Sequence, residues 1–137
     1  MRLSLKSRSI GRRAAWLVLA CWVGGAPSWS VAAPSPAVQV EIDHLFGYLE
    51  QSGCRFNRNG TWYMASEAAD HLKKKHDYLV RRGLLSTTES FIELAASKSS
   101  TSGQPYLVEC QGAPARASGP WFQDELARFR RDRNPSR

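Results

Sequence analysis

The sequence predicts a single small α+β domain, with about four helices packed on a small antiparallel sheet made of a hairpin and one later strand. Two observations predict this fold class. Apolar residues recur every three or four positions in several stretches, as they do on the buried face of a helix. Between two of these stretches stands an Asn-Gly pair flanked by aromatic residues, which is typical of a β-hairpin. A chain of 137 residues suits one such domain.

The first 33 residues have the organisation of a secretory signal peptide. A basic segment is followed by an uncharged apolar stretch at residues 14–26, and small residues then lead into a proline-rich start. This stretch is too short for a membrane span, which needs about 20 apolar residues. We therefore predict cleavage after Ala32 or Ala33, a periplasmic location and no stable membrane span in the remaining chain.

Three other interpretations of this segment are weaker. Arg12 and Arg13 resemble a twin-arginine export signal, but the residues around them fit poorly. Cys21 follows Val-Leu-Ala as in a lipidation site, although the leucine is bulky for its position. An uncleaved anchor over residues 14–33 would be interrupted by Pro27. A lipoprotein anchored at Cys21 is therefore the less favoured localisation.

The positive charge of the chain belongs mostly to the predicted signal. The formal charge is +7, from 19 basic and 12 acidic residues. Five of the basic residues and none of the acidic ones precede the predicted cleavage site, which leaves +2 on the exported part. The high isoelectric point is therefore no sign of nucleic-acid binding, and we expect no nucleic-acid partner.

Two cysteines remain after the predicted cleavage, Cys54 and Cys110. An even pair in an exported small domain favours a disulfide. The alternative is two buried free thiols. A bridge would tie the first strand of the predicted hairpin to the later strand.

The exported part divides into a linker at residues 34–37, a folded domain at residues 38–131 and a flexible tail at residues 132–137. The first predicted helix spans residues 38–50. Asn59-Gly60 is the predicted hairpin turn, because both central positions of that turn need a positive φ.

Capping signals place the later helices. Ser66 is the predicted cap of a helix that runs to about residue 82, and Gly83 ends it. Ser86 and Glu89 form a predicted capping box for a third helix, with Leu85 as its hydrophobic staple.

The last third of the chain alternates strand, loop and helix. Residues 105–110 read as a strand with Tyr106 and Val108 on one face and Leu107 on the other. Residues 111–119 read as a loop, and Pro120 suits the first turn of a last helix.

Four segments taken together resemble a known family. They are SGCRFNRNG, EAADHLKKK, TTESFIELAASKSSTSGQPYLVEC and WFQDELARFR. On these segments the chain resembles the YfeK-like family of small exported bacterial proteins, from about residue 42 to residue 130. The resemblance implies a signal peptide, a compact α+β domain and no assigned activity.

The serine-rich loop at residues 97–103 is the main candidate binding site. Its small side chains let the backbone approach a ligand, and its hydroxyls and amides suit an anion or a sugar. The alternative is that the hydroxyls cap the helix and form turns with their own backbone. Residues elsewhere complete the candidate set. The candidate ligand-binding residues are Arg58, His71, Ser97, Ser99, Ser100, Ser102, Gly103 and Tyr106.

Arg58, at the predicted hairpin tip, has two interpretations. It recognises a carboxylate or a phosphate of a ligand. Alternatively, it pairs with Asp70 or Glu67 and fixes the hairpin onto the following helix.

A serine-dependent hydrolase is the weakest functional hypothesis. His71 would act as the base for a loop serine, oriented by Asp70 or Glu67. The exported part has neither a G-x-S-x-G elbow nor a Ser-x-x-Lys motif. The spacing of His71 and His76 does not suit a shared metal. We therefore assign no catalytic residue, no metal and no cofactor.

The basic run at residues 73–75, with Arg81 and Arg82, does not fit one face of a helix and is interrupted by acidic residues. A solvated surface is the preferred interpretation over a lipid-binding patch. The sequence thus predicts a monomeric, non-enzymatic binding or interaction domain of the cell envelope. Its partner would be an envelope protein or a small ligand, and an anion binder using the serine loop is the first alternative.

Overall fold

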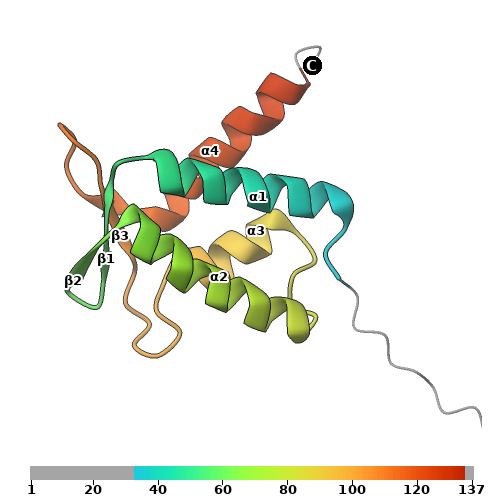
Figure 1. The fold of residues 1–137 in the computed structure, drawn as a ribbon, viewed down its shortest axis with the longest axis horizontal. Helices are drawn as coiled ribbons and strands as arrows, with labels where there is room; N and C mark the ends of the chain where they lie inside the picture. Colours follow the sequence, from blue (N-terminus) through green and yellow to red (C-terminus); the bar gives the residue numbers. More distant parts are fainter. Residues whose placement is uncertain (1–32, 135–137) are drawn as a thin grey trace, which may run out of the picture.

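The structure, a computed structural model, describes residues 33–134 and confirms a small α+β domain (Figure 1). The predicted signal peptide lies outside the described residues apart from Ala33, and so do residues 135–137 of the predicted tail. Within residues 33–134, no helix has the length and apolar character needed to cross a membrane. The elements in chain order are α1 (Pro36–Gln51), β1 (Arg55–Arg58), β2 (Thr61–Met64), α2 (Ala65–Arg81), α3 (Thr88–Phe91), the π-helical segment η1 (Ile92–Ala96), β3 (Leu107–Glu109), β4 (Arg116–Ala117) and α4 (Ser118–Arg133).

Helix α1 begins two residues earlier than the sequence predicts. The Ser35 hydroxyl accepts a hydrogen bond from the Val38 amide at 3.4 Å, and Pro36 occupies the first turn, where its missing amide proton costs nothing. Pro36 and Ala37 are therefore helical and do not belong to a linker. The buried face of α1 follows the predicted spacing, since Ile42, Leu45 and Leu49 are fully buried.

The hairpin turn forms at the predicted Asn59-Gly60 pair. Asn59 has a φ of 53° and Gly60 a φ of 86°, the left-handed backbone that this two-residue turn requires. Arg58 pairs with Thr61 across the turn. In Figure 1 the hairpin stands at one end of α1 and α2, which run side by side.

The sheet has the strand order β2-β1-β3-β4, and all its neighbouring strands are antiparallel. Tyr106 and Val108 are buried and Leu107 is only partly buried, which confirms the predicted faces of this segment. The predicted loop at residues 111–119 is wrong in part, because it contains β4 and the first two residues of α4. A two-residue strand leaves no alternating pattern in the sequence.

Helix α2 begins at Ala65, so Ser66 is not its cap. Met64 stands at the cap position, and the Glu67 carboxylate accepts the Met64 backbone amide at 3.0 Å. The predicted end is confirmed. Gly83 has a φ of 66° and donates its amide to Val80, while Leu84 donates to Leu79.

The capping box of α3 lies one residue later than predicted. Thr87 and Ser90 form it, with the Thr87 hydroxyl accepting the Ser90 amide at 3.1 Å and the Ser90 hydroxyl accepting the Thr87 amide at 3.2 Å. Glu89, the predicted partner of Ser86, instead pairs with Arg130 of α4. The helix then widens into η1, and such π-helical turns occur often at functional sites.

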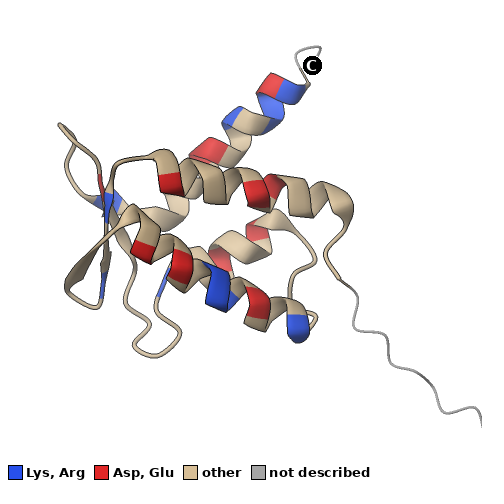
Figure 2. Ribbon diagram, viewed as in Figure 1, with Lys and Arg blue, Asp and Glu red and all other residues tan. Residues whose placement is uncertain are grey.

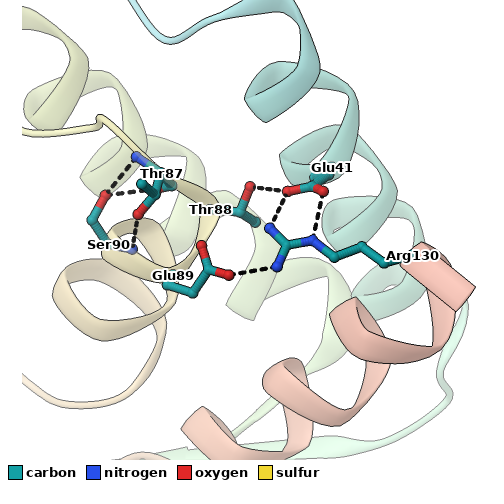
Figure 3. A network of polar contacts seen from close by, with 6 residues as sticks. All are labelled: Glu41, Thr87, Thr88, Glu89, Ser90 and Arg130. Carbon is teal, nitrogen blue, oxygen red and sulfur yellow. Dashed lines mark hydrogen bonds and ion pairs between the residues drawn. The ribbon is translucent and has the colours of Figure 1, made fainter. Parts of the chain in front are cut away.

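A polar network joins three helices (Figure 3). Arg130 of α4 donates to both carboxylate oxygens of Glu41 in α1, at 2.7 and 2.8 Å, and to Glu89 at 2.6 Å. The buried Thr88 hydroxyl also donates to Glu41. Hydrogen bonding by Arg130 lowers the pKa of Glu41 and the pKa of Glu89.

Basic residues gather on the last turns of α4 (Figure 2). The helix continues to Arg133, two residues into the predicted tail.

A disulfide joins Cys54 and Cys110, as the sequence predicts, with their Cα atoms 4.2 Å apart. Cys54 directly precedes β1, and Cys110 directly follows β3. Arg55 and Glu109 are paired residues of these strands, so the disulfide covalently links the next pair of positions along the β1–β3 ladder.

Candidate functional site

A cavity of about 330 Å³ lies between the hairpin, α2 and the start of α4. Its volume falls at the lower end of the range of small-molecule sites. Its walls combine fully buried apolar side chains with a polar rim. The lining residues are Leu49, Phe56, Asn57, Arg58, Tyr63, Glu67, Ala68, Asp70, His71, Leu72, Lys74, Ala96, Tyr106, Ser118 and Phe122.

Arg58 is the central polar residue of the rim. It lies two residues after the buried Phe56 on β1, so the alternation of the strand directs both side chains to the same face of the sheet. Its Nη1 atom is 2.6 Å from Nδ1 and 3.2 Å from Nε2 of His71. Its Nη2 atom is 3.4 Å from the Tyr63 hydroxyl, and the guanidinium lies 5.1 Å from the centre of the Tyr63 ring.

The contacts of Arg58 with the ring nitrogens favour a neutral His71. A guanidinium only donates hydrogen bonds, so a ring nitrogen that it bonds must be an unprotonated acceptor. His71 Nε2 also lies 3.4 Å from the Tyr106 hydroxyl. Arg58, His71 and Tyr106 therefore form one connected row of polar groups along the cavity rim.

The electrostatics of the rim agree with this assignment. Burial lowers the pKa of His71, and Arg58, Lys75 and Lys74 lower it further. Burial raises the pKa of Tyr106. At neutral pH the imidazole is therefore uncharged and the phenol keeps its proton, which leaves Arg58 as the one charged member of the row.

Lys75 is a feature of this region that the sequence analysis missed. Its Nζ atom donates to the Lys98 carbonyl at 3.1 Å and lies 5.2 Å from the centre of the Tyr106 ring. Burial, followed by the charge of Arg58, lowers the pKa of Lys75 to about 8. The signal that identifies it is its spacing of four from His71, which puts both side chains on the same face of α2.

The serine loop is attached to the hairpin by its hydroxyls. The buried Ser99 hydroxyl accepts the Thr101 and Ser102 amides at 3.4 and 3.3 Å and contacts the Asn59 side chain at 3.5 Å. The Ser102 hydroxyl donates to Asn59 Oδ1 at 2.6 Å. The bonds of the Ser99 hydroxyl with the two amides are the turn-forming interactions that the sequence offered as the alternative to ligand binding by this loop.

The other predicted loop residues do not line the cavity. Ser97 donates to the Ile92 carbonyl at 2.8 Å and packs so closely on Gly119 that an added Cβ there would lie 2.6 Å from the Ser97 hydroxyl. Ser100 is exposed, and Gly103 has the φ of 72° that its turn requires. Of the candidate set, the structure places Arg58, His71 and Tyr106 in the cavity, with Ser99 next to Tyr106.

A comparison with protein families matches residues 36–130 to a family of unknown function, DUF5329. The chain belongs to the DUF5329 family. No curated protein and no solved structure matches it. The match covers the whole cavity of this DUF5329 domain, from α1 to most of α4.

Two sequence hypotheses find no support in the geometry of this DUF5329 domain. Arg58 contacts His71 and Tyr63, and no ion pair joins it to Asp70 or Glu67 in the part of the chain that the structure describes. Between residues 33 and 134 no serine hydroxyl is hydrogen-bonded to His71, as a serine nucleophile would require. The same residues hold no cluster of three or more histidine, cysteine or acidic side chains placed for a metal.

Proposed function

We propose that this DUF5329 domain is an exported, non-enzymatic binding domain that holds a small anion in the cavity between the hairpin and α2. The observation that carries the proposal is the position of Arg58. Its guanidinium is half-buried at the cavity rim, and within residues 33–134 it has no carboxylate partner. A partly desolvated guanidinium gains most from a hydrogen-bonded anion, because it presents a planar set of donors.

The charges near the cavity support an anionic ligand. Besides burial, the charges of Arg58, Lys75 and Lys74 lower the pKa of His71, so three cations lie near the imidazole. Tyr63 and Tyr106 add two hydroxyl donors at the same rim. A ligand oxygen placed beside Arg58 would therefore meet a cation and neutral donors.

The binding function is tested by thermal unfolding and isothermal titration with acetate, benzoate, octanoate, sulfate and phosphate. At least one of these anions should raise the midpoint of unfolding of the wild-type domain, by linkage. Arg58→Leu should abolish that shift. Arg55→Leu is the matched control, since Arg55 lies on the same strand, pairs with Glu109 and does not line the cavity. Equal responses of the two variants, or no response of the wild type to any anion, would refute the proposal.

Export and periplasmic residence are part of the proposal. The signal-like residues 1–33 and the disulfide support them, because disulfides persist in oxidising compartments. We further propose that the protein is monomeric and groups with the YfeK-like proteins. The mass of the protein recovered from the periplasm of a bacterial host should lack the signal and two hydrogens. A mass that retains the signal, or that includes lipid on Cys21, would contradict export by cleavage.

A further inference from the structure

The inner wall of the cavity is apolar. Leu49, Phe122 and Ala96 line it and are at most 2% exposed, and Phe56 and Leu72 complete it. Among the described residues, no buried polar side chain of the wall lacks a hydrogen-bond partner. The Ser118 hydroxyl already donates to the Ala96 carbonyl at 2.5 Å. In the described part of the chain, the buried side-chain nitrogen or oxygen without a partner is His76 Nε2, which does not line this cavity.

The size of the cavity limits what fits. Liquid water occupies about 30 Å³ per molecule, so a volume of about 330 Å³ corresponds to about ten non-hydrogen atoms. A compact anion such as phosphate would fill the rim and leave the apolar wall without a contact. The matching ligand therefore has a polar head at the rim and an apolar body inside.

The charge balance of the rim disfavours a head with two negative charges. Four charged side chains line the cavity, the cations Arg58 and Lys74 and the acids Glu67 and Asp70. His71 is neutral at neutral pH because its pKa is lowered. The two carboxylates would repel a dianion, whereas a single carboxylate beside Arg58 gains a bidentate pair of hydrogen bonds.

We infer that the cavity takes a monocarboxylate with an unbranched apolar body of medium length, that is, a medium-chain fatty acid. The inference rests on the anion-binding function proposed above and adds the class of ligand. The carboxylate lies against Arg58 with the Tyr63 and Tyr106 hydroxyls as neutral donors. The alkyl chain runs along Leu49, Phe56 and Phe122 toward the start of α4.

The test is a chain-length series measured by isothermal titration on the full exported domain, from acetate through butanoate, hexanoate and octanoate to dodecanoate. Each buried methylene should tighten binding about fourfold until the cavity is full. The gain should end near octanoate or decanoate, which match the cavity volume. Octanol, the uncharged counterpart of octanoate, should bind at least about tenfold more weakly, because it gains no pair with Arg58.

A wall variant tests where the chain lies. Ala68 is partly buried on α2 and lines the cavity, so Ala68→Leu should shorten the best-bound chain. Ala127→Leu is the matched control, since Ala127 is exposed on α4 outside the cavity. The series on the wild-type domain decides the inference even if Ala68→Leu does not fold.

The outcomes separate the two proposals. Anion binding that depends on Arg58 but is equal for acetate and octanoate would overturn the fatty-acid inference and leave the binding function intact. Equal binding of octanol and octanoate, unaffected by Arg58→Leu, would overturn both. Absence of binding by every carboxylate and every inorganic anion would likewise overturn both. Capture of a peptide with a C-terminal leucine carboxylate, but not of octanoate, would overturn the ligand class.

Discussion

His71 determines how many positive charges the cavity presents at a given pH. Its pKa is lowered by burial and by the neighbouring cations, so it is neutral at neutral pH. Acidification protonates it beside Arg58, and a bound carboxylate attracts that proton. Octanoate should therefore bind more tightly at about pH 5.5 than at about pH 7.5, with proton uptake on binding. Titration in buffers of different ionisation enthalpy measures that uptake.

The control is His71→Gln, which keeps hydrogen-bonding groups but does not titrate in this range. Its octanoate affinity should change little between the two pH values. A wild-type pH dependence that persists unchanged in this variant would assign the effect to another group.

Lys75 gives a prediction for stability in alkaline solution. Its pKa in the folded domain is lowered from 10.5 to about 8 by burial and by Arg58. Between these two values the unfolded chain holds the Lys75 proton and the folded chain does not. The unfolded state thus binds more protons, and the contribution of Lys75 to the free energy of unfolding rises with pH across this window.

The measurement compares wild type with Lys75→Met by urea unfolding at about pH 7 and at about pH 10. The difference between the two proteins removes the effect of the other titrating groups. The wild type should gain stability relative to the variant at the higher pH. The same difference at both pH values would show that Lys75 titrates alike in the folded and unfolded chains.

At the scale of the elements, Arg130 is the link between α1, α3 and α4. It donates three hydrogen bonds to Glu41 and Glu89 (Figure 3). Arg130→Leu should lower the free energy of unfolding by about 1–2 kcal/mol, more than a single exposed ion pair, because the contacts with Glu41 are bidentate and the Glu41 side chain is partly buried. Arg131→Leu is the matched control, since Arg131 is exposed and forms no ion pair with the residues described. A loss of similar size in both variants would refute the role of the network.

Elements set by local chemistry were predictable from the sequence. The Asn59-Gly60 turn and the Gly83 helix end follow from the positive φ that few other residues adopt. The predicted cap at Ser86 was wrong by one residue, because Thr87 offered a competing cap. The predicted cap at Ser66 was wrong by two residues, because β2 ends at Met64 and α2 begins at the next residue. At α3, Thr87 with Ser90 replaced the predicted pair. Strand β4 was missed because two residues carry no periodicity.

The candidate site was predictable only in part, because it depends on contacts between distant segments. Arg58 and Tyr106 lie far from each other in the sequence, and both contact His71 only when β1, α2 and the segment before β3 pack together. The sequence identified Arg58, His71 and Tyr106 by residue type. It assigned the leading role to the serine loop, whose hydroxyls prove to be occupied by the turn and by Asn59. The apolar wall of the cavity could not be predicted from the sequence, because its residues have the same pattern as other residues of the hydrophobic core.

At the scale of the whole molecule, the disulfide links the hairpin to the later part of the sheet. Cys54 and Cys110 are separated by 56 positions and join the ends of the paired strands β1 and β3, of which β1 belongs to the hairpin. A loop of this size contributes about 4 kcal/mol in the chain-entropy description. A small domain has a total stability of about 5–15 kcal/mol, so the bridge accounts for a large share of it.

Replacing both cysteines by alanine should therefore lower the midpoint of thermal unfolding strongly, and reduction of the wild type should do the same. The cavity should respond as well. Because β1 carries Arg58, loosening the β1–β3 ladder should weaken octanoate binding. Saturating octanoate should partly restore the lowered midpoint of unfolding. Thermal unfolding with and without reductant, each with and without octanoate, measures both effects. An unchanged midpoint after reduction would show that the disulfide adds nothing to the stability of the folded domain.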